Sequence, residues 1–290
     1  MTVTVIQQGR VIDPRSLVDK VQDLVIIDGK ITHCGNMPNN IRPDQVIDAK
    51  NHWVIPGIID LYTQFNVLQD INTIAKQAVK FGITTLCVSP NAQTVIDNAK
   101  VARAIIQSCQ PDVRCLPYAA LTRHFSAKEL VDVADLQQAG CIGLHNAGIS
   151  LNDTQLLRHC FEYAATFDLP IFITPLDGDL AQHGLMHEGA VSARLGLTGI
   201  PDIAESIDVF RCLELAAYTG ARLHFSRISS ARVLPLIKQA KADGLAVTAD
   251  VSIQNLYLTD MDIKLPLCFD RHNFNTNPAI YQVENPRFIK

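Results

Sequence analysis

Apolar and polar positions alternate in two different ways along this chain. Up to residue 52, short apolar runs are separated by turn-forming residues, which is typical of β-strands. The clearest turn is Asp28-Gly29, between Val25-Ile26-Ile27 and Ile31-Thr32, because an Asp-Gly pair suits a two-residue hairpin with positive φ. We therefore predict a meander of short strands over residues 1–52.

From residue 53 onward, apolar strand candidates alternate with helical segments, which predicts parallel βα units. Seven such units of even spacing favour a TIM-type (β/α)8 barrel over an open sheet. The predicted strands are 53–61, 83–88, 113–119, 140–144, 169–174, 221–226 and 245–250, and the helices between them are 70–81, 95–109, 126–139, 152–167, 202–219 and 230–243.

The eighth unit of such a barrel is missing from the pattern. After the seventh strand the sequence shows no further helix and strand before Lys290. A barrel has to close in order to remove the free edges of its sheet. Either the chain is part of a longer protein or another element covers the gap, and we expect the first.

Composition limits the class of protein. The chain has 290 residues, of which 48% are hydrophobic and 19% charged, and a formal net charge of −4, so it can bury a large core and offers no basic surface for nucleic acid. No stretch approaches the length of a membrane span, and the N-terminus lacks the pattern of a signal peptide. We expect a cytoplasmic protein that does not bind membranes.

The cysteines are scattered and include no C-x-x-C pair. We therefore predict that they are reduced thiols, most of them in the core. They are Cys34, Cys87, Cys109, Cys115, Cys141, Cys160, Cys212 and Cys268.

The stretch Val54-Ile-Pro-Gly-Ile-Ile-Asp-Leu61 resembles the first barrel strand of the cyclic amidohydrolases. Later segments resemble one branch, the bacterial dihydroorotases, most closely over His187–Asp202 and also over Val88–Asn98. The resemblance extends over residues 1–281. It implies an amidohydrolase-type barrel over residues 53–290, truncated before its eighth unit, and a small β-sandwich portion over residues 1–52.

In that family, imidazoles and carboxylates at the strand ends hold catalytic zinc. The positions that the resemblance assigns to these ligands carry other side chains here, and none of them is a good ligand for a hydrolytic metal. A guanidinium is permanently charged and repels a cation. We therefore predict no catalytic residue, no metal site and no cofactor. The five degenerate positions are Tyr62, Gln64, Asn146 (or Ala147), Thr174 and Arg227.

Some positions on the substrate side retain polar side chains. Asn91 and Asn277 match asparagines that contact the substrate in the family, and Asn66 replaces an arginine that binds the substrate carboxylate. These three residues are a possible remnant pocket. Asparagine also suits turns, and we favour that structural interpretation.

The sequence offers little support for other chemistry. The nine histidines include no H-x-H and no H-E-x-x-H pattern, and Gly-x-Ser-x-Gly and the glycine-rich nucleotide motifs are absent. Arg227 at the barrel mouth either binds an anion in place of metals or pairs with Asp177 or Asp250. We favour the ion pair.

The resemblance therefore implies a dihydroorotase-like fold without the family's reaction. In some bacteria, inactive dihydroorotase-like chains are partners of aspartate carbamoyltransferase in pyrimidine synthesis, and we expect such a structural role and a homo-oligomer here. One alternative is an active cyclic amidohydrolase with an atypical metal site. A second alternative is a small-molecule sensor that uses Asn91, Arg227 and Asn277.

Overall fold

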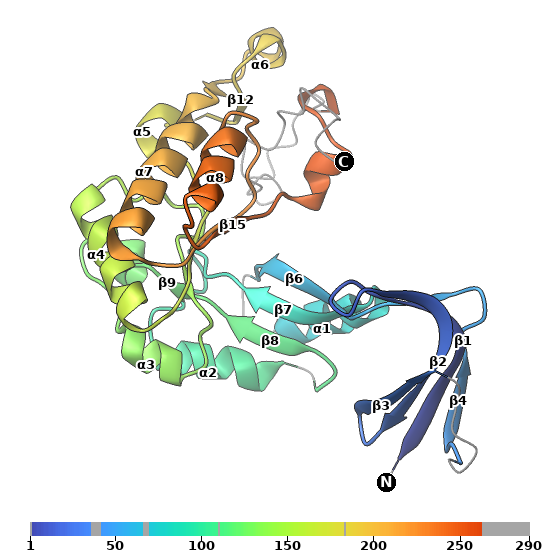
Figure 1. The fold of residues 1–290 in the computed structure, drawn as a ribbon. Helices are drawn as coiled ribbons and strands as arrows, with labels where there is room; N and C mark the ends of the chain where they lie inside the picture. Colours follow the sequence, from blue (N-terminus) through green and yellow to red (C-terminus); the bar gives the residue numbers. More distant parts are fainter. Residues whose placement is uncertain (1, 36–41, 66–69, 110, 183, 263–290) are drawn as a thin grey trace. The chain divides into compact units, whose positions relative to one another are not determined.

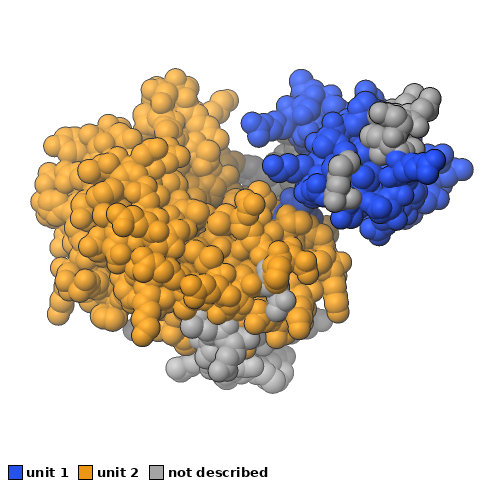
Figure 2. Space-filling model, turned by 90° about the horizontal axis from the view of Figure 1, so that it is seen from below, with its two compact units in different colours: residues 1–58 blue, residues 59–290 orange. Residues whose placement is uncertain are grey.

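The computed structural model describes residues 2–35, 42–65, 70–109, 111–182 and 184–262, and Figure 1 shows the fold. The chain divides into two compact units, residues 1–58 and residues 59–290, which Figure 2 distinguishes by colour.

The first unit contains one five-stranded sheet. β1 pairs with β2 antiparallel and with β4 and β5 in parallel, and β3 continues the sheet beyond β2. The predicted hairpin is confirmed, because Asp28 and Gly29 join β2 to β3 with φ values of 48° and 76°. The strands are β1 (Val3–Asp13), β2 (Val18–Ile27), β3 (Lys30–Gly35), β4 (Gln45–Asp48) and β5 (Trp53–Val54).

The second unit contains two sheets of the barrel-type strands, with the orders β6-β7-β8 and β15-β14-β11-β10-β9. The pairings β7–β8 and β9–β10–β11–β14–β15 are parallel. A short parallel pair, β12–β13, stands apart. The strands are β6 (Ile58–Thr63), β7 (Ile83–Val88), β8 (Arg114–Pro117), β9 (Ala119–Ala120), β10 (Leu144–His145), β11 (Ile171–Ile173), β12 (Met186–His187), β13 (Gly199–Ile200), β14 (Leu223–Phe225) and β15 (Val247–Ala249).

Helices alternate with these strands, and all of them except the short α5 and α6 share one large apolar core with the strands. Their buried faces include Ala75, Ala102, Cys160 and Cys212, while the strands contribute Leu86, Ile171 and Phe225 among others. The helices are α1 (Ile71–Lys80), α2 (Ala99–Ser108), α3 (Val133–Gln138), α4 (Thr154–Thr166), α5 (Gly178–Ala181), α6 (Ala190–Leu195), α7 (Ile203–Thr219) and α8 (Val233–Ala242).

The predicted strand over residues 53–61 is wrong in one respect, because the apolar run is divided between two sheets. β5 pairs with β1 in the first unit, whereas β6 lies beside β7 in the second. Pro56 and Gly57 separate the two strands. Proline has no N–H to donate to a ladder and glycine weakens a strand interior, which explains the break.

The predicted helix over residues 126–139 is also longer than the observed one. Only Val133–Gln138 is helical. Upstream of it, His124, Phe125 and Ala127 have φ values between 51° and 53°, a left-handed conformation that a right-handed helix excludes.

The cysteine prediction needs a correction. Cys109, at the end of α2, and Cys115, in β8, form a disulfide with a Cα–Cα distance of 6.0 Å. The two residues are only six positions apart across a connection, and a sequence pattern without C-x-x-C gave no sign of this proximity. Cys268 lies outside the described residues.

Two further expectations concern the whole fold. Within the described residues the barrel-type sheets do not close, because β6 and β15 are each the last strand of a sheet. No helix in the described part of the chain is long and apolar enough to cross a bilayer.

Candidate functional site

Arg227 follows β14, and its side chain contacts two residues from other strands: Tyr62 in β6 and Thr174 at the end of β11. Its guanidinium lies over the ring of Tyr62, with Cζ 3.7 Å from the ring centroid. Its Nη2 donates a hydrogen bond to Thr174 Oγ1 at 3.2 Å. Parallel strands place their carboxyl ends at the same edge, so residues far apart in the sequence meet there. We call Tyr62, Thr174 and Arg227 the strand-end cluster.

The ion pair that we favoured for Arg227 is wrong for the described residues. Asp250 Oδ1 accepts the backbone N–H of Arg227 at 2.6 Å, and its Oδ2 pairs with His224 Nε2 at 2.9 Å. Asp177 instead caps α5, where it accepts backbone N–H groups. Both carboxylates are therefore occupied elsewhere, and the guanidinium makes no ion pair within the described chain.

Burial lowers the pKa of Arg227 below its ordinary value, and nearby Tyr62 and Asp250 oppose this effect. A guanidinium remains charged near neutral pH in proteins. The strand-end cluster therefore contains a positive charge that is largely removed from water.

The backbone at Arg227 has a φ of 57°, in the left-handed region. For a residue with a side chain this conformation costs on the order of 1–2 kcal/mol, so the surroundings have to hold it. Asp250 accepts a hydrogen bond from the backbone N–H of Arg227, and Glu205 of α7 accepts hydrogen bonds from the backbone a few residues later in the same loop.

Glu205 is only 2% exposed and accepts the backbone N–H groups of Ser229 and Ser230 at 2.9–3.1 Å, together with the Ser229 hydroxyl at 2.6 Å. Burial raises its pKa above 4.5, and the hydrogen bonds from Ser229 and Ser230 lower it in part. This carboxylate therefore anchors the loop that carries Arg227.

His145, in β10, is completely buried beside the cluster. Its Nδ1 accepts the backbone N–H of Ala147 at 2.7 Å, so the proton of the neutral ring lies on Nε2. That Nε2 has no hydrogen-bond partner among the described residues. Burial, followed by the charges of Arg227 and His224, lowers the pKa of His145 to about 3. At neutral pH His145 is an uncharged donor.

Aromatic rings surround His145. Its ring centroid lies 5.4 Å from that of Tyr62 and 5.5 Å from that of Tyr118, and Phe172 stacks at 6.3 Å. The Tyr118 hydroxyl is buried without a hydrogen-bond partner in the described chain, and burial raises its pKa. The surroundings of His145 are therefore mainly aromatic, and a few buried polar atoms there have no hydrogen-bond partner among the described residues.

Asn146 ties the loop after β10 to the end of β11. Its Oδ1 accepts the N–H of Thr174 at 2.9 Å and its Nδ2 donates to the Thr174 carbonyl at 3.0 Å. This amide therefore serves as a bridge between two loops.

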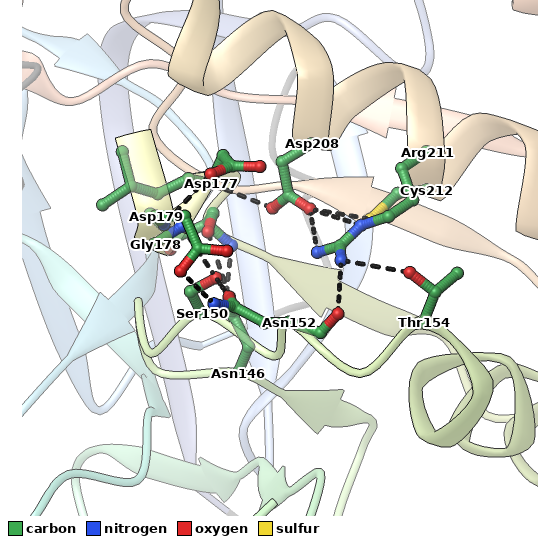
Figure 3. Close-up of polar contacts among 12 residues, drawn as sticks. Asn146, Ser150, Asn152, Thr154, Asp177, Gly178, Asp179, Asp208, Arg211 and Cys212 are labelled. Atoms are coloured by element: carbon green, nitrogen blue, oxygen red, sulfur yellow. Dashed lines mark hydrogen bonds and ion pairs between the residues drawn. The ribbon is translucent and has the colours of Figure 1, made fainter. Parts of the chain in front are cut away.

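A second polar network continues along the same loops, as Figure 3 shows. Asp208 of α7 accepts the N–H of Leu176 at 2.9 Å and pairs with Arg211, which also reaches the Asn152 carbonyl and the Thr154 hydroxyl. These contacts bind the loops after β10 and β11 to one face of α7.

The remaining predicted positions lie away from the guanidinium contacts. Gln64 Nε2 donates to the carbonyl of Pro90 at 3.3 Å. Asn91 holds a turn, because its Oδ1 accepts the N–H groups of Gln93 and Thr94 while its Nδ2 donates to a carbonyl. Asn66 and Asn277 lie outside the described residues.

The donor set does not fit a hydrolytic metal. The side chains that occupy the expected ligand positions offer a phenol, two amides, a hydroxyl and a guanidinium, whereas zinc prefers thiolate, imidazole and carboxylate. Around the residues that the structure describes, no three His, Cys, Asp or Glu side chains gather into a group able to hold a metal ion. No chemical step can be derived through a metal here.

Sequence reasoning missed several residues of the site. His145 directly precedes a predicted ligand position and could have been found from that neighbour alone. The role of Asp250 follows only from the left-handed turn at Arg227. No sequence signal pointed to Glu205, because its partners Ser229 and Ser230 are about 25 positions away.

Comparison with known families gives one match over more than half of the chain. A family model described as dihydro-orotase-like matches residues 51–232. This range includes all three residues of the strand-end cluster.

Two curated proteins illustrate the similarity. The chain is 36% identical over 292 residues to a dihydroorotase of Anaeromyxobacter sp. (strain K), covering 98% of this chain and 67% of the relative. It is 37% identical over 267 residues to a dihydroorotase-like protein of Pseudomonas aeruginosa, covering 90% of this chain and 63% of the relative. The chain therefore spans about two thirds of these relatives.

The fold is similar to that of solved amidohydrolases. An L-hydantoinase from Arthrobacter aurescens superposes with a TM-score of 0.76 at 18% identity, covering 90% of this chain and 61% of that protein. A dihydropyrimidinase from Brevibacillus agri gives a TM-score of 0.73 at 17% identity, with coverage of 94% and 61%. These similarities support an α/β fold of the hydantoinase type.

Proposed function

Because this chain belongs to the dihydro-orotase-like family, we propose that it is a non-catalytic member that acts as a structural protein of pyrimidine biosynthesis. The proposal includes a partnership with aspartate carbamoyltransferase, a homo-oligomeric state and a cytoplasmic location. The fold that accompanies it is of the (β/α)8 barrel type, with a small β-sandwich portion at the N-terminus.

The observation that carries this proposal is the Arg227 guanidinium, which contacts two further degenerate positions, Tyr62 and Thr174. Two unit charges about 4 Å apart repel by about 4 kcal/mol at an effective dielectric constant of 20, so a divalent ion there would be repelled by about 8 kcal/mol. The arginine at this position therefore provides no metal ligand, and its charge also repels a metal ion.

A structural role is compatible with a degenerate site. Activity depends on a few side chains at strand ends, whereas the outer surface of a fold is set by other residues. Loss of the ligands therefore leaves subunit contacts free to persist.

Two measurements test the absence of catalysis. Metal analysis of the purified protein should give far less than one zinc per chain, and a dihydroorotate hydrolysis assay should give no turnover above a blank. Stoichiometric zinc together with turnover would refute the proposal.

The partnership is tested separately by co-expression with the aspartate carbamoyltransferase of the same organism. We expect the two proteins to elute together in size-exclusion chromatography, at a mass above that of either protein alone. Independent elution at every concentration tested would refute the partnership without bearing on catalysis.

A second candidate function is active hydrolysis of a cyclic amide, since the curated Anaeromyxobacter relative is named a dihydroorotase. In that case the metal ligands would have to lie outside the five expected positions. The same metal analysis and hydrolysis assay distinguish the two functions.

A further inference from the structure

We propose that the strand-end cluster binds a small anion, either a carboxylate group or a chloride ion, between Arg227 and His145. The inference goes beyond the structural role, because it assigns this end of the strands a ligand of opposite charge to a catalytic metal. It concerns only residues that the structure describes.

The positive charge of Arg227 favours an anion as the ligand. The Arg227 guanidinium is largely buried and makes no ion pair within the described chain, where its contacts are an aromatic face and a neutral hydroxyl. A buried charge without a partner is strongly unfavourable. Asp250 is near enough for its charge to raise the pKa of Arg227, but its two oxygens bond to the Arg227 backbone and to His224, and it makes no ion pair with the guanidinium.

Two buried hydrogen-bond donors near the cluster lack an acceptor. Arg227 Nε and His145 Nε2 are both buried and have no hydrogen-bond partner among the described residues. Both atoms carry a proton, because arginine is always a donor and His145 Nδ1 is already an acceptor. An unmatched buried donor costs about 1–3 kcal/mol, and an anion can accept hydrogen bonds from several donors.

Arg227 and His145 are also close to each other. The two groups contact the same ring, since Arg227 Cζ lies 3.7 Å from the Tyr62 centroid and the His145 ring lies 5.4 Å from it. His145 also responds electrostatically to Arg227. The two side chains therefore neighbour the same ring and lie within electrostatic range of each other.

The glycine at position 148 leaves space beside the guanidinium. Gly148 has a φ of 76°, and a Cβ placed there would meet Arg227 Nη2 at 3.6 Å and no other atom within 4 Å, its chain neighbours aside. The absent side chain leaves room for a ligand atom next to this nitrogen. A water molecule in that room would accept hydrogen bonds but would leave the charge uncompensated, so an anion fits better.

The test uses trifluoroacetate as a ¹⁹F NMR probe of the whole protein, before and after treatment with EDTA followed by removal of the chelator. We expect its line to broaden with protein concentration and to sharpen again when a competitor displaces it. Displacement by acetate identifies a carboxylate site, and displacement by chloride alone identifies a halide site. Either result supports the proposal.

Two variants locate the site. Arg227→Gln should raise the dissociation constant at least about tenfold, because a charge-assisted hydrogen bond is lost. Arg232→Gln is the matched control, since Arg232 is exposed and pairs with Asp202 at the surface, and it should bind like the wild type. Arg227→Lys keeps the charge and should give an intermediate affinity.

Several outcomes would overturn the proposal. They are the absence of broadening with the wild-type protein, equal broadening with Arg227→Gln and Arg232→Gln, and loss of broadening on chelation. If Arg227→Gln does not fold, Arg227→Lys takes its place, and an affinity equal to that of Arg232→Gln would overturn the proposal.

Discussion

Arg227 combines three features that usually occur apart: a buried cation, a left-handed backbone and an aromatic face as its main contact. Cation–π contacts contribute on the order of 0.5–2 kcal/mol, rising as water is removed. Tyr62 therefore offsets part of the burial cost of the guanidinium. The remaining cost is the physical reason why this residue carries the anion proposal.

His145 should give the protein a characteristic acid sensitivity. Its folded pKa of about 3 lies below its ordinary value of 6.5, so the unfolded chain binds the proton more readily. Stability should therefore fall as the pH is lowered from 6.5 toward 3. Urea unfolding at several pH values should show a shallower loss for His145→Gln than for the wild type.

Unfolding of the two proteins at pH 7, where the His145 ring is uncharged in the folded chain, provides the reference from which each loss is measured. Identical slopes for His145→Gln and the wild type would contradict the assignment.

The sequence located the strand-end residues but not what they do. The resemblance named Tyr62, Thr174 and Arg227 separately, and strand-end geometry implied that they would meet. The contact of the guanidinium with a ring rather than a carboxylate depends on the left-handed turn after β14, and no residue pattern encodes that turn. Asn91 is the opposite case, because the favoured turn interpretation agrees with its hydrogen bonds.

At the scale of elements, α7 organises the site through two buried carboxylates one turn apart. Glu205 holds the loop after β14 and Asp208 holds the loop after β11. Both residues are less than 4% exposed. The helix thus holds, through backbone N–H groups, the two loops that carry Thr174 and Arg227.

Glu205→Gln should destabilise the protein by about 1–3 kcal/mol, because an amide cannot accept all the hydrogen bonds of a buried carboxylate. Urea unfolding monitored by circular dichroism measures this change. Glu214→Gln, on the exposed side of the same helix, should change stability by less than about 0.5 kcal/mol. Equal losses for the two variants would show that the contacts of Glu205 contribute nothing specific.

The difference in stability between the wild type and Glu205→Gln should also depend on pH. The folded pKa of Glu205 is raised, so the stability linked to its proton is fully present below 4.5 and is lost as the pH rises through the folded pKa. The advantage of the wild type over Glu205→Gln should therefore be larger at pH 4.5 than at pH 7. An advantage that grows with pH would contradict this sign.

Secondary structure followed the sequence well where apolar periodicity was strong. The strand predicted over residues 83–88 is β7 as observed, and the helix predicted over 202–219 begins one residue later. Two failures occurred where local chemistry competed with the pattern, at Pro56-Gly57 and at the left-handed residues before α3. The strand predicted over residues 113–119 is also wrong in that it is divided between β8 and β9, in two sheets, and the one predicted over 140–144 begins only at Leu144. Burial alone does not reveal such breaks.

At the scale of the whole molecule, we expect stability to be independent of metal. A ligand that binds only the folded state raises the unfolding temperature, and removing it lowers that temperature. Because the residues at the strand ends do not fit zinc, treatment with EDTA should leave the melting temperature within about 1 °C of its original value. A zinc-containing enzyme treated in parallel is the positive control, and a fall of several degrees in this protein would contradict the expectation.

The order of the strands was predictable for the whole molecule, whereas closure was not. Alternating βα units give parallel neighbours, as observed from β9 to β15. Closure depends on which strand, if any, lies between β6 and β15, and the described residues supply none.

Among the described residues β6 has no strand on its outer side, and this has a consequence for association between molecules. Ile59 and Leu61 are 57% and 40% exposed on this last strand, and an apolar edge strand is a template for pairing between molecules. Light scattering of the isolated chain should therefore rise steeply with concentration. Ile59→Lys should suppress the rise, whereas Val79→Lys, at an exposed position of α1, should not.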